Sequence, residues 1–482
     1  MIPTIIGAAV AAVGLWLLVA GSTLNLLLFV LACSAMGGSA AALIPALGNV
    51  NIQPANLALG FLLLRCLIDA SAGRGSLGRA VVENRFLVLF ALYGLVGAWV
   101  LPHLFRGAID VTPLRPIPGR SLFITFPLAF SPQNITVSTY VMGTMVAGVC
   151  ATMAARVDRA PAAIARWGAG IGIAHAVLGV ASVVLASTPA NAVFLFFRNG
   201  NYAQVSQSFD GFVRMNGIFA EPAIYASYGF AWLVLMVELW LRSVETRWTG
   251  LAALALLVAL AASTATTAYV ALAGYGVLLA ARSIVSPGLI RPDRLLLVGF
   301  IGLLALTGAL VAVAVSPALG DAVAEIARKT TTEKLASASG MQRLFWARQG
   351  IDAFLVSGGL GVGLGSFRSS SIATAILGAV GVPGTLAILL HLWRVLMPLR
   401  RSTHAAHGDP SSMTGAALSW TAVAMLIPSI VAAPSPDPGL LWGIFGGTAL
   451  ALRPAFGRKA LTWLRPATPR AAGFASSRPS AG

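Results

Sequence analysis

Long apolar segments follow one another through almost the whole chain, and they restrict the fold more than any other feature. They lie near residues 2–20, 24–45, 54–71, 86–101, 134–155, 167–187, 216–241, 249–263, 266–283, 294–316, 371–393, 411–432 and 438–452. Most have about the 20 residues that an α-helix needs to cross a bilayer, so we expect about 12–13 transmembrane helices. None shows the strict alternation of an outer-membrane barrel strand. The sequence therefore predicts an all-α polytopic membrane protein.

Composition agrees with this class. Of the 482 residues, 57% are hydrophobic and 10% are charged, which is too little charge to cover a soluble protein of this length. The first apolar run has no basic n-region and leads directly into another, so we expect a retained first span, not a cleaved signal. We expect residues 1–452 to form one polytopic membrane domain and residues 453–482 to form a basic, disordered cytoplasmic tail.

The net charge of +17 has an uneven distribution along the chain. Arginines fill alternate connections, at residues 74–85, 156–166, 242–247, 282–294 and 394–401, and continue in the tail. If every apolar run crosses once, all of these connections lie on one side, which the positive-inside rule assigns to the cytoplasm. The basic charge then reflects topology and contact with anionic membrane lipid, and we expect no nucleic-acid binding.

Three long connections alternate with the arginine-rich ones and are expected on the opposite, periplasmic side: residues 102–133, 188–215 and 317–370, the last being a large late loop. Arg106, Arg328, Lys329 and Lys334 lie in ordinary loop sequence, where a solvated surface is expected. Arg214, Arg343, Arg348 and Arg368 instead adjoin helix ends or a glycine turn. Charge at a membrane edge is costly, so a functional role is the default hypothesis for these four, and Arg198 joins them as a substrate-binding candidate.

The stretch RMNGIFAEPAIYASYGF, residues 214–230, places charges where an apolar run begins. Asn216 is a candidate helix cap, and Pro222 suits a first helical turn. Arg214 would then lie beside the partially positive helix N-terminus, an arrangement suited to an anion. Two interpretations of Glu221 remain open: an ion-pair partner of Arg214 or another loop arginine, or a general base in a partly dry site.

A second group of candidates lies in SGMQRLFWARQGIDAFLVSGGLGVGLGSFRSSS, residues 339–371. Arg343 and Arg348 are five residues apart and could grip one group from two sides. The glycine run is no dinucleotide fingerprint, because no strand precedes it and its spacing differs. We expect its backbone N–H groups, at Gly363, Gly365 and Ser366, to approach a phosphate. The alternative is a glycine-rich turn without a ligand.

Taken together, these residues resemble the O-antigen polymerase and O-antigen ligase superfamily. The resemblance covers about residues 200–450. It rests on Arg214, Gly217 and Pro222, on the late loop with Arg343 and Trp346, and on the segments GVGLGSF and ILGAVGVPG. The segment STATTAY, residues 263–269, also resembles the family, but a hairpin bend is the simpler interpretation of it. It implies a C-type glycosyltransferase-like helical fold in the bacterial inner membrane. It also implies metal-independent, inverting transfer from undecaprenyl-pyrophosphate-linked sugars at the periplasmic face.

The residues are compatible with that chemistry. Arginine binds phosphate oxygens through its planar fork. The outer loops contain no Asp-x-Asp motif, so arginines would have to stabilise the leaving pyrophosphate without a metal, and no cofactor is expected. The catalytic candidates are Glu221, Arg214 and Arg343, with Asp352 as the second choice for a base. Arg348, Arg368 and Arg198 are the arginine candidates for binding the pyrophosphate or the glycan.

Two further alternatives are open. Ligases of the superfamily carry a histidine in the late loop, but residues 317–370 contain none. We therefore expect a polymerase of exopolysaccharide, capsule or O-antigen repeat units, with a flippase and a chain-length co-polymerase as partners. PSPDPG, residues 434–439, also resembles the polymerases. A transporter or flippase would typically show related halves, and we find no repeat.

Overall fold

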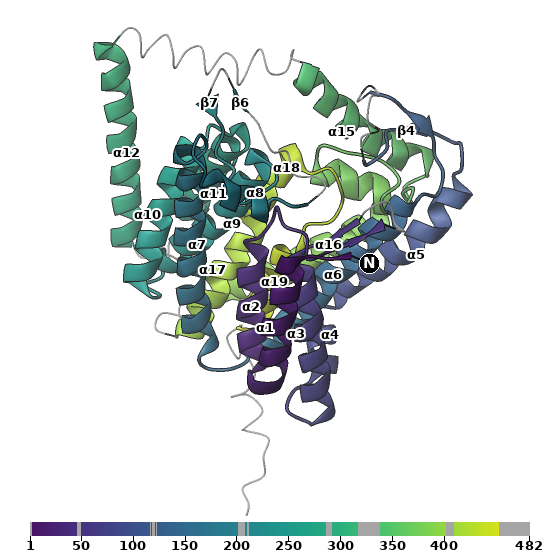
Figure 1. Ribbon diagram of the computed structural model, residues 1–482, viewed down its shortest axis with the longest axis horizontal. Coiled ribbons are helices and arrows are strands. Elements are labelled where there is room, and N and C mark those ends of the chain that lie inside the picture. Colours follow the sequence, from purple (N-terminus) through teal and green to yellow (C-terminus); the bar gives the residue numbers. More distant parts are fainter. Residues whose placement is uncertain are drawn as a thin grey trace, which may run out of the picture.

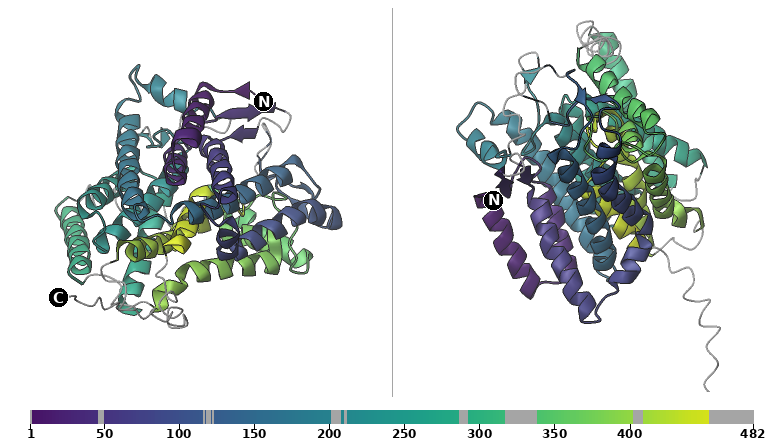
Figure 2. Two further views of the ribbon diagram at one scale, coloured as in Figure 1. Left: turned by 90° about the horizontal axis from the view of Figure 1, so that it is seen from below. Right: turned by 90° about the vertical axis from the view of Figure 1, so that its right-hand side faces the viewer.

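The computed structural model describes residues 2–45, 50–115, 117, 121, 123–200, 208–209, 212–285, 292–316, 338–401 and 409–452. Helices dominate it and lie side by side (Figures 1 and 2). They are α1 (Ile5–Ala20), α2 (Thr23–Ser34), α3 (Pro54–Ser71), α4 (Leu77–Glu83), α5 (Arg85–Leu104), α6 (Pro132–Ala154), α7 (Ala160–Val184), α8 (Asn191–Phe197), α9 (Pro222–Leu241), α10 (Thr246–Ala262), α11 (Thr266–Val285), α12 (Pro292–Val315), α15 (Ala338–Val356), α16 (Ile372–Arg401), α17 (Pro410–Ala424), α18 (Leu426–Ala432) and α19 (Leu440–Ala451).

Each apolar run of the sequence contains a helix, or the pair α17 and α18, although the run near residues 24–45 is helical only as far as Ser34 and ends in a short strand. Within the described residues, eight spans are long and apolar enough to cross a membrane, and α1, α2, α10 and α19 are shorter apolar helices. The polytopic all-α class is thus confirmed. The STATTAY segment is the predicted hairpin bend, because Ser263, Thr264 and Ala265 join α10 to α11. Residues 317–337 of the late loop, with Arg328, Lys329 and Lys334, and the tail 453–482 lie outside the described residues.

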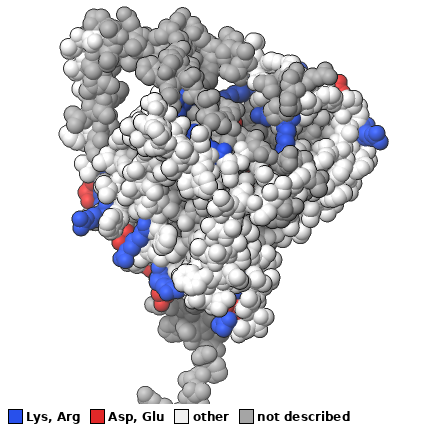
Figure 3. Space-filling view, viewed as in Figure 1, with Lys and Arg blue, Asp and Glu red and all other residues white. Residues whose placement is uncertain are grey.

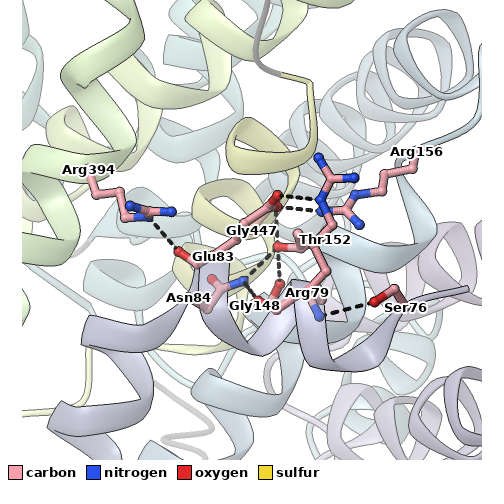
Figure 4. Close-up of polar contacts among 10 residues, drawn as sticks. Ser76, Arg79, Glu83, Asn84, Gly148, Thr152, Arg156, Arg394 and Gly447 are labelled. Atoms are coloured by element: carbon pink, nitrogen blue, oxygen red, sulfur yellow. Dashed lines mark hydrogen bonds and ion pairs between the residues drawn. The ribbon is translucent and has the colours of Figure 1, made fainter. Parts of the chain in front are cut away.

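One end of the bundle, called here the ion-paired end, is held by salt bridges between connections. Asp69 pairs with Arg74 at 3.0 Å, and Arg166 pairs with Glu245 at 3.0 Å. Glu83, at the end of α4, receives Arg156 at 2.5 Å (Figure 4). Its backbone carbonyl accepts a hydrogen bond from Arg394 of α16 at 2.8 Å. The arginines of alternate connections therefore gather at one end, as the positive-inside pattern requires.

Three small antiparallel sheets lie in the connections of the opposite end, called here the loop end. The first joins β1 (Ile2–Pro3), β2 (Ala42–Ile44) and β3 (Val50–Ile52), with Leu43 opposite both Ile2 and Asn51. The others pair β4 (Asp110–Val111) with β5 (Phe126–Pro127) and β6 (Ser208–Phe209) with β7 (Phe212–Val213). Figure 3 shows positively charged side chains around a hollow near the top, and mixed charges along the lower edge.

Close packing of α19 against α6 determines the depth at which the last connection lies. A side chain at Gly443 would come within 2.3 Å of the Thr144 carbonyl oxygen, and one at Gly447 within 2.0 Å of that of Gly148. Small residues at this spacing let two membrane helices approach closely. The Thr152 hydroxyl donates to the Gly447 carbonyl at 2.9 Å (Figure 4). Because α19 starts beside the middle of α6, the connection from α18 to α19 enters the bundle from the loop end.

Candidate functional site

The segment before α9 differs from the sequence prediction at its helix start. Glu221, not Asn216, occupies the N-cap position of α9, and its side chain makes no capping hydrogen bond. Pro222 is the first helical residue, because a proline loses no hydrogen bond there. Asn216 is instead buried in a turn that ends with Phe219. The Glu221 carboxylate therefore lies at the mouth of α9 and not within the helix, as a cap at Asn216 would have placed it.

Arg198 holds this segment in place and is already occupied by protein groups. It is buried and donates through Nε to the Gly217 carbonyl at 2.9 Å and through NH2 to Asn216 Oδ1 at 2.6 Å. Burial lowers the pKa of this guanidinium. Gly217, with φ of 53°, is held in turn by the Ser182 hydroxyl at 3.0 Å. Two of the three guanidinium nitrogens of Arg198 thus bond to its own loop, which gives the side chain a positioning role. The substrate-binding role expected for Arg198 stays a prediction.

Arg214, Glu221 and Arg368, named here the arginine–glutamate cluster, come together from two loops far apart in sequence. Burial lowers the pKa of both guanidinium groups, and the nearby Glu221 carboxylate opposes that shift in each case. The Nε atoms of Arg214 and Arg368 are buried and have no hydrogen-bond partner in the described part of the chain. Buried guanidinium donors normally find partners. The cluster therefore presents two cationic groups with unsatisfied donors beside one carboxylate.

Arg368 is fixed rigidly for a side chain with an open donor. Its NH1 donates to the Leu114 carbonyl at 2.8 Å, and its guanidinium carbon lies 4.3 Å from the centre of the Trp346 ring. Its backbone N–H donates to the Thr112 carbonyl at 2.9 Å. Gln349 of α15 bonds both the backbone N–H and the hydroxyl of Thr112 at 3.0 Å. The loop that carries Thr112, helix α15 and the end of the glycine turn are thereby joined behind Arg368.

Arg343 and Arg348 do not share a target. Five residues on an α-helix are about 140° apart, and the structure places Arg348 outward, with its side chain 78% exposed and 3.8 Å from Asp352. Arg343 is half-buried on the side of Trp346, and its carbonyl accepts a hydrogen bond from the Ser370 hydroxyl at 2.5 Å. The expected two-sided grip is therefore wrong. Asp352, the second candidate base, is likewise engaged at the surface.

The glycine turn packs into a break in α16. Gly381, with φ of 56°, interrupts that helix, and Pro383 has no N–H to donate to Ala379. The turn supplies the missing partners: Gly363 N–H donates to the Ala379 carbonyl and Val362 N–H to that of Gly378, both at 2.9 Å.

Two more predicted phosphate ligands are used in the same packing. A side chain at Gly365 would come within 2.3 Å of the Gln133 carbonyl oxygen. The Ser366 hydroxyl donates to Val362 at 2.8 Å and accepts from Asn134 at 2.9 Å. The roles expected for Gly363, Gly365 and Ser366 are corrected accordingly, because these groups serve close packing between α6 and α16.

An apolar cavity of about 470 Å³ leads along α7 to the segment before α9. Its walls come from α2, α7 and α9, including Ala32, Trp167, Ile171 and Leu178. Gly217, Ile218 and Phe219 close the end nearest the arginine–glutamate cluster. The loop that carries Arg214 and Glu221 therefore forms one wall of an apolar cavity between membrane helices.

Asp437 is a carboxylate that the sequence analysis did not select. It lies in the connection between α18 and α19, and its Oδ1 accepts from the Thr144 hydroxyl at 2.7 Å and from Gly439 N–H at 3.1 Å. Pro434 in the same connection accepts from the backbone N–H of Ser369, the neighbour of Arg368, at 3.1 Å. The available sequence signal was an acid between two prolines within an apolar region.

Among the described residues, no group of three or more His, Cys, Asp or Glu side chains could hold a metal ion. Comparison of the chain with known protein families, curated proteins and solved structures finds no match. The chain is a multi-pass helical membrane protein, and its resemblance to the O-antigen polymerase and ligase superfamily rests on the motifs alone.

Proposed function

We propose that the protein is a membrane glycosyltransferase that polymerises undecaprenyl-pyrophosphate-linked oligosaccharide repeat units. In this proposal the loop end faces the periplasm of a bacterial inner membrane, and the product is exopolysaccharide, capsule or O-antigen. The observation that carries it is the arginine–glutamate cluster, in which the Nε–H groups of Arg214 and Arg368 are buried without hydrogen-bond partners. An arginine fork matches phosphate oxygens in geometry and charge.

The cluster and the apolar cavity together fit an amphiphilic anion. The pyrophosphate would bind Arg214 and Arg368, and the apolar chain would enter the cavity that ends at Phe219. Stabilising the pyrophosphate as it leaves the anomeric carbon is electrostatic catalysis by fixed cations. Leu114 and Trp346 hold Arg368 before substrate arrives, so little reorganisation would be needed during the reaction.

The test uses the protein in lipid vesicles with lipid-linked repeat units extracted from cells that lack it. Polymer on the lipid carrier, with release of undecaprenyl pyrophosphate, is the expected result. Transfer of a finished glycan to a different lipid acceptor would instead indicate a ligase. Absence of any transfer, while the protein binds inorganic pyrophosphate, would refute the proposed activity.

A second candidate function, transport of the same lipid-linked sugars, is favoured by one observation. Helix α16 is broken at Gly381, and α19 starts beside the middle of α6. Discontinuous membrane helices are typical of transporters. Movement of lipid-linked single units across the vesicle bilayer without polymer formation would establish that alternative.

A further inference from the structure

We propose that Asp437 is the general base that removes the proton from the acceptor hydroxyl, while Glu221 holds the two arginines that bind the leaving group. This inference rests on the proposed polymerase function. It places a catalytic carboxylate in the connection between α18 and α19.

The geometry of the reaction separates the two carboxylates. In an inverting displacement, the attacking oxygen approaches the anomeric carbon from the face opposite the leaving group. The base lies on that attacking side, and in inverting glycosidases the two catalytic carboxyl groups are about 6.5–9.5 Å apart for this reason. Glu221 acts electrostatically on Arg214 and Arg368, which would bind the pyrophosphate. Its position is therefore on the leaving-group side, where a base has no proton to remove.

Asp437 lies in a different connection of the loop end from Glu221. Its connection touches the arginine-bearing loop through Pro434 and Ser369, and Asp437 follows Pro434 by three residues toward the middle of α6. A substrate whose pyrophosphate is at Arg368 would have this connection beside it. The two carboxylates thus come from the segment before α9 and from the connection before α19, and Glu221 is the one that acts electrostatically on the arginines of the cluster.

The side chain of Asp437 is held in the way a base requires. Both of its hydrogen bonds, from Thr144 and from Gly439, go to Oδ1. Oδ2 has no hydrogen bond in the described part of the protein, and the residue is partly exposed. One oxygen therefore fixes the orientation and the other is open to a donor. No salt bridge joins Asp437 to a described basic side chain.

Among the described residues, the titratable group near Asp437 is Tyr140 of α6, and Arg115 of the loop before α6 lies near Tyr140. Asp437 and Arg115 both act electrostatically on the Tyr140 phenol, whose hydroxyl donates to the Asn51 carbonyl at 3.3 Å. A carboxylate without a guanidinium partner accepts a proton more readily than one paired directly with guanidinium groups.

The step balances without another reactant. The O–H bond of the acceptor hydroxyl breaks as its proton passes to Asp437 Oδ2, and its oxygen forms the new glycosidic bond to the anomeric carbon. The bond from that carbon to the pyrophosphate oxygen breaks with its electron pair, and the added negative charge stays on the pyrophosphate between Arg214 and Arg368. The Asp437 proton then passes to solvent at the loop end.

The experiment measures initial rates of polymer formation and, separately, binding of inorganic pyrophosphate to the intact protein in vesicles. Asp437→Asn should lower kcat by about 100- to 10,000-fold, with KM and pyrophosphate affinity within about twofold of wild type. Thr144→Val should lower kcat less, because it only loosens Oδ1. Glu221→Gln should lower kcat/KM by less than about tenfold, since an amide oxygen still holds a guanidinium group. Asp352→Asn is the matched control and should leave both measurements unchanged.

Each outcome decides the inference. Asp437→Asn with a kcat within threefold of wild type would refute it and leave the polymerase function standing. Loss of pyrophosphate binding in Asp437→Asn would refute it too, because the side chain would then be structural. A kcat loss in Glu221→Gln as large as the one in Asp437→Asn would return the base role to Glu221. A wild-type protein that forms no polymer would refute the proposed function itself.

Discussion

Replacing Arg368 by lysine tests the central part of the proposed site. The charge is kept, but lysine cannot donate to the Leu114 carbonyl, lie flat on Trp346 and hold a phosphate at the same time. Arginine can do all three because Nε has no hydrogen-bond partner in the described part of the chain while NH1 is bonded. Loss of one preorganised charge-assisted contact in the transition state costs roughly 2–4 kcal/mol. That corresponds to a rate reduction of about 30- to 1,000-fold.

The supporting tryptophan gives a graded second measurement. The ring centre lies 4.3 Å from the Arg368 guanidinium carbon, a contact worth about 1–2 kcal/mol when it is shielded from water. Trp346→Leu should therefore lower kcat/KM by about 5- to 30-fold. The effect should be small in a protein that already carries Arg368→Lys, because both changes act on the same guanidinium group.

Arg348→Lys on the same helix is the control. Its side chain is 78% exposed, and its ion pair with Asp352 is 3.8 Å long, so a change within about threefold is expected. The assay is polymer formed from extracted lipid-linked repeat units in vesicles, at fixed ionic strength. Equal losses in Arg368→Lys and Arg348→Lys would mean that the loop end is general solvated surface, and would refute the site.

Three further predictions concern topology and packing. Thr188→Cys at the loop end should react with an impermeant maleimide on intact cells, and Ser76→Cys at the ion-paired end should not. The native Cys33, Cys66 and Cys150 are buried and should not react. The reverse labelling would invert the proposed orientation. Gly363→Ala should lower thermal stability in detergent by about 1–3 kcal/mol, because φ is 97° and the new methyl group would lie 2.8 Å from the Gly97 carbonyl oxygen. Gly60→Ala, which meets open space, should leave stability unchanged or raise it, and equal losses in the two would argue against the packing described. Arg198→Ala should lower stability by at least about 2 kcal/mol and also abolish activity, because Gly217 and Asn216 lose their hydrogen-bond donor. An active variant of normal stability would show that the segment before α9 does not depend on Arg198.

The sequence identified the individual pieces of the site with uneven success. Arg214 and Glu221 were selected because charges at the mouth of an apolar run are costly wherever that run lies. The helix start was misplaced at Asn216, although Pro222 marks it, because several residues of that stretch are compatible with a cap. Arg348 was paired with Arg343 from proximity in sequence, whereas their angular separation on α15 directs one of them to the surface.

Glycine and acid residues were harder to assign, because their roles depend on what lies opposite them. A glycine-rich run is equally compatible with a phosphate cradle and with close packing. The break of α16 at Gly381 leaves backbone carbonyls without partners inside the helix, and Val362 and Gly363 donate hydrogen bonds to them. The setting of Asp437 depends on a distant contact, since its partner Thr144 is 293 residues away.

The sequence by itself determined that this is a multi-pass helical membrane protein and roughly where its apolar helices lie, but it did not indicate α15 inside the expected late loop. Helix length, hydropathy and the distribution of arginine are local properties, and a bilayer satisfies them one segment at a time. Only the tertiary structure decided which charged residues meet. The association of Arg214, Glu221 and Arg368, the bonding of Arg198 to its own loop, and the position of Asp437 all depend on helix packing between distant segments. That packing is set by the fit of small residues such as Gly443 against Thr144, and a pattern of small residues does not by itself identify the helix against which it packs.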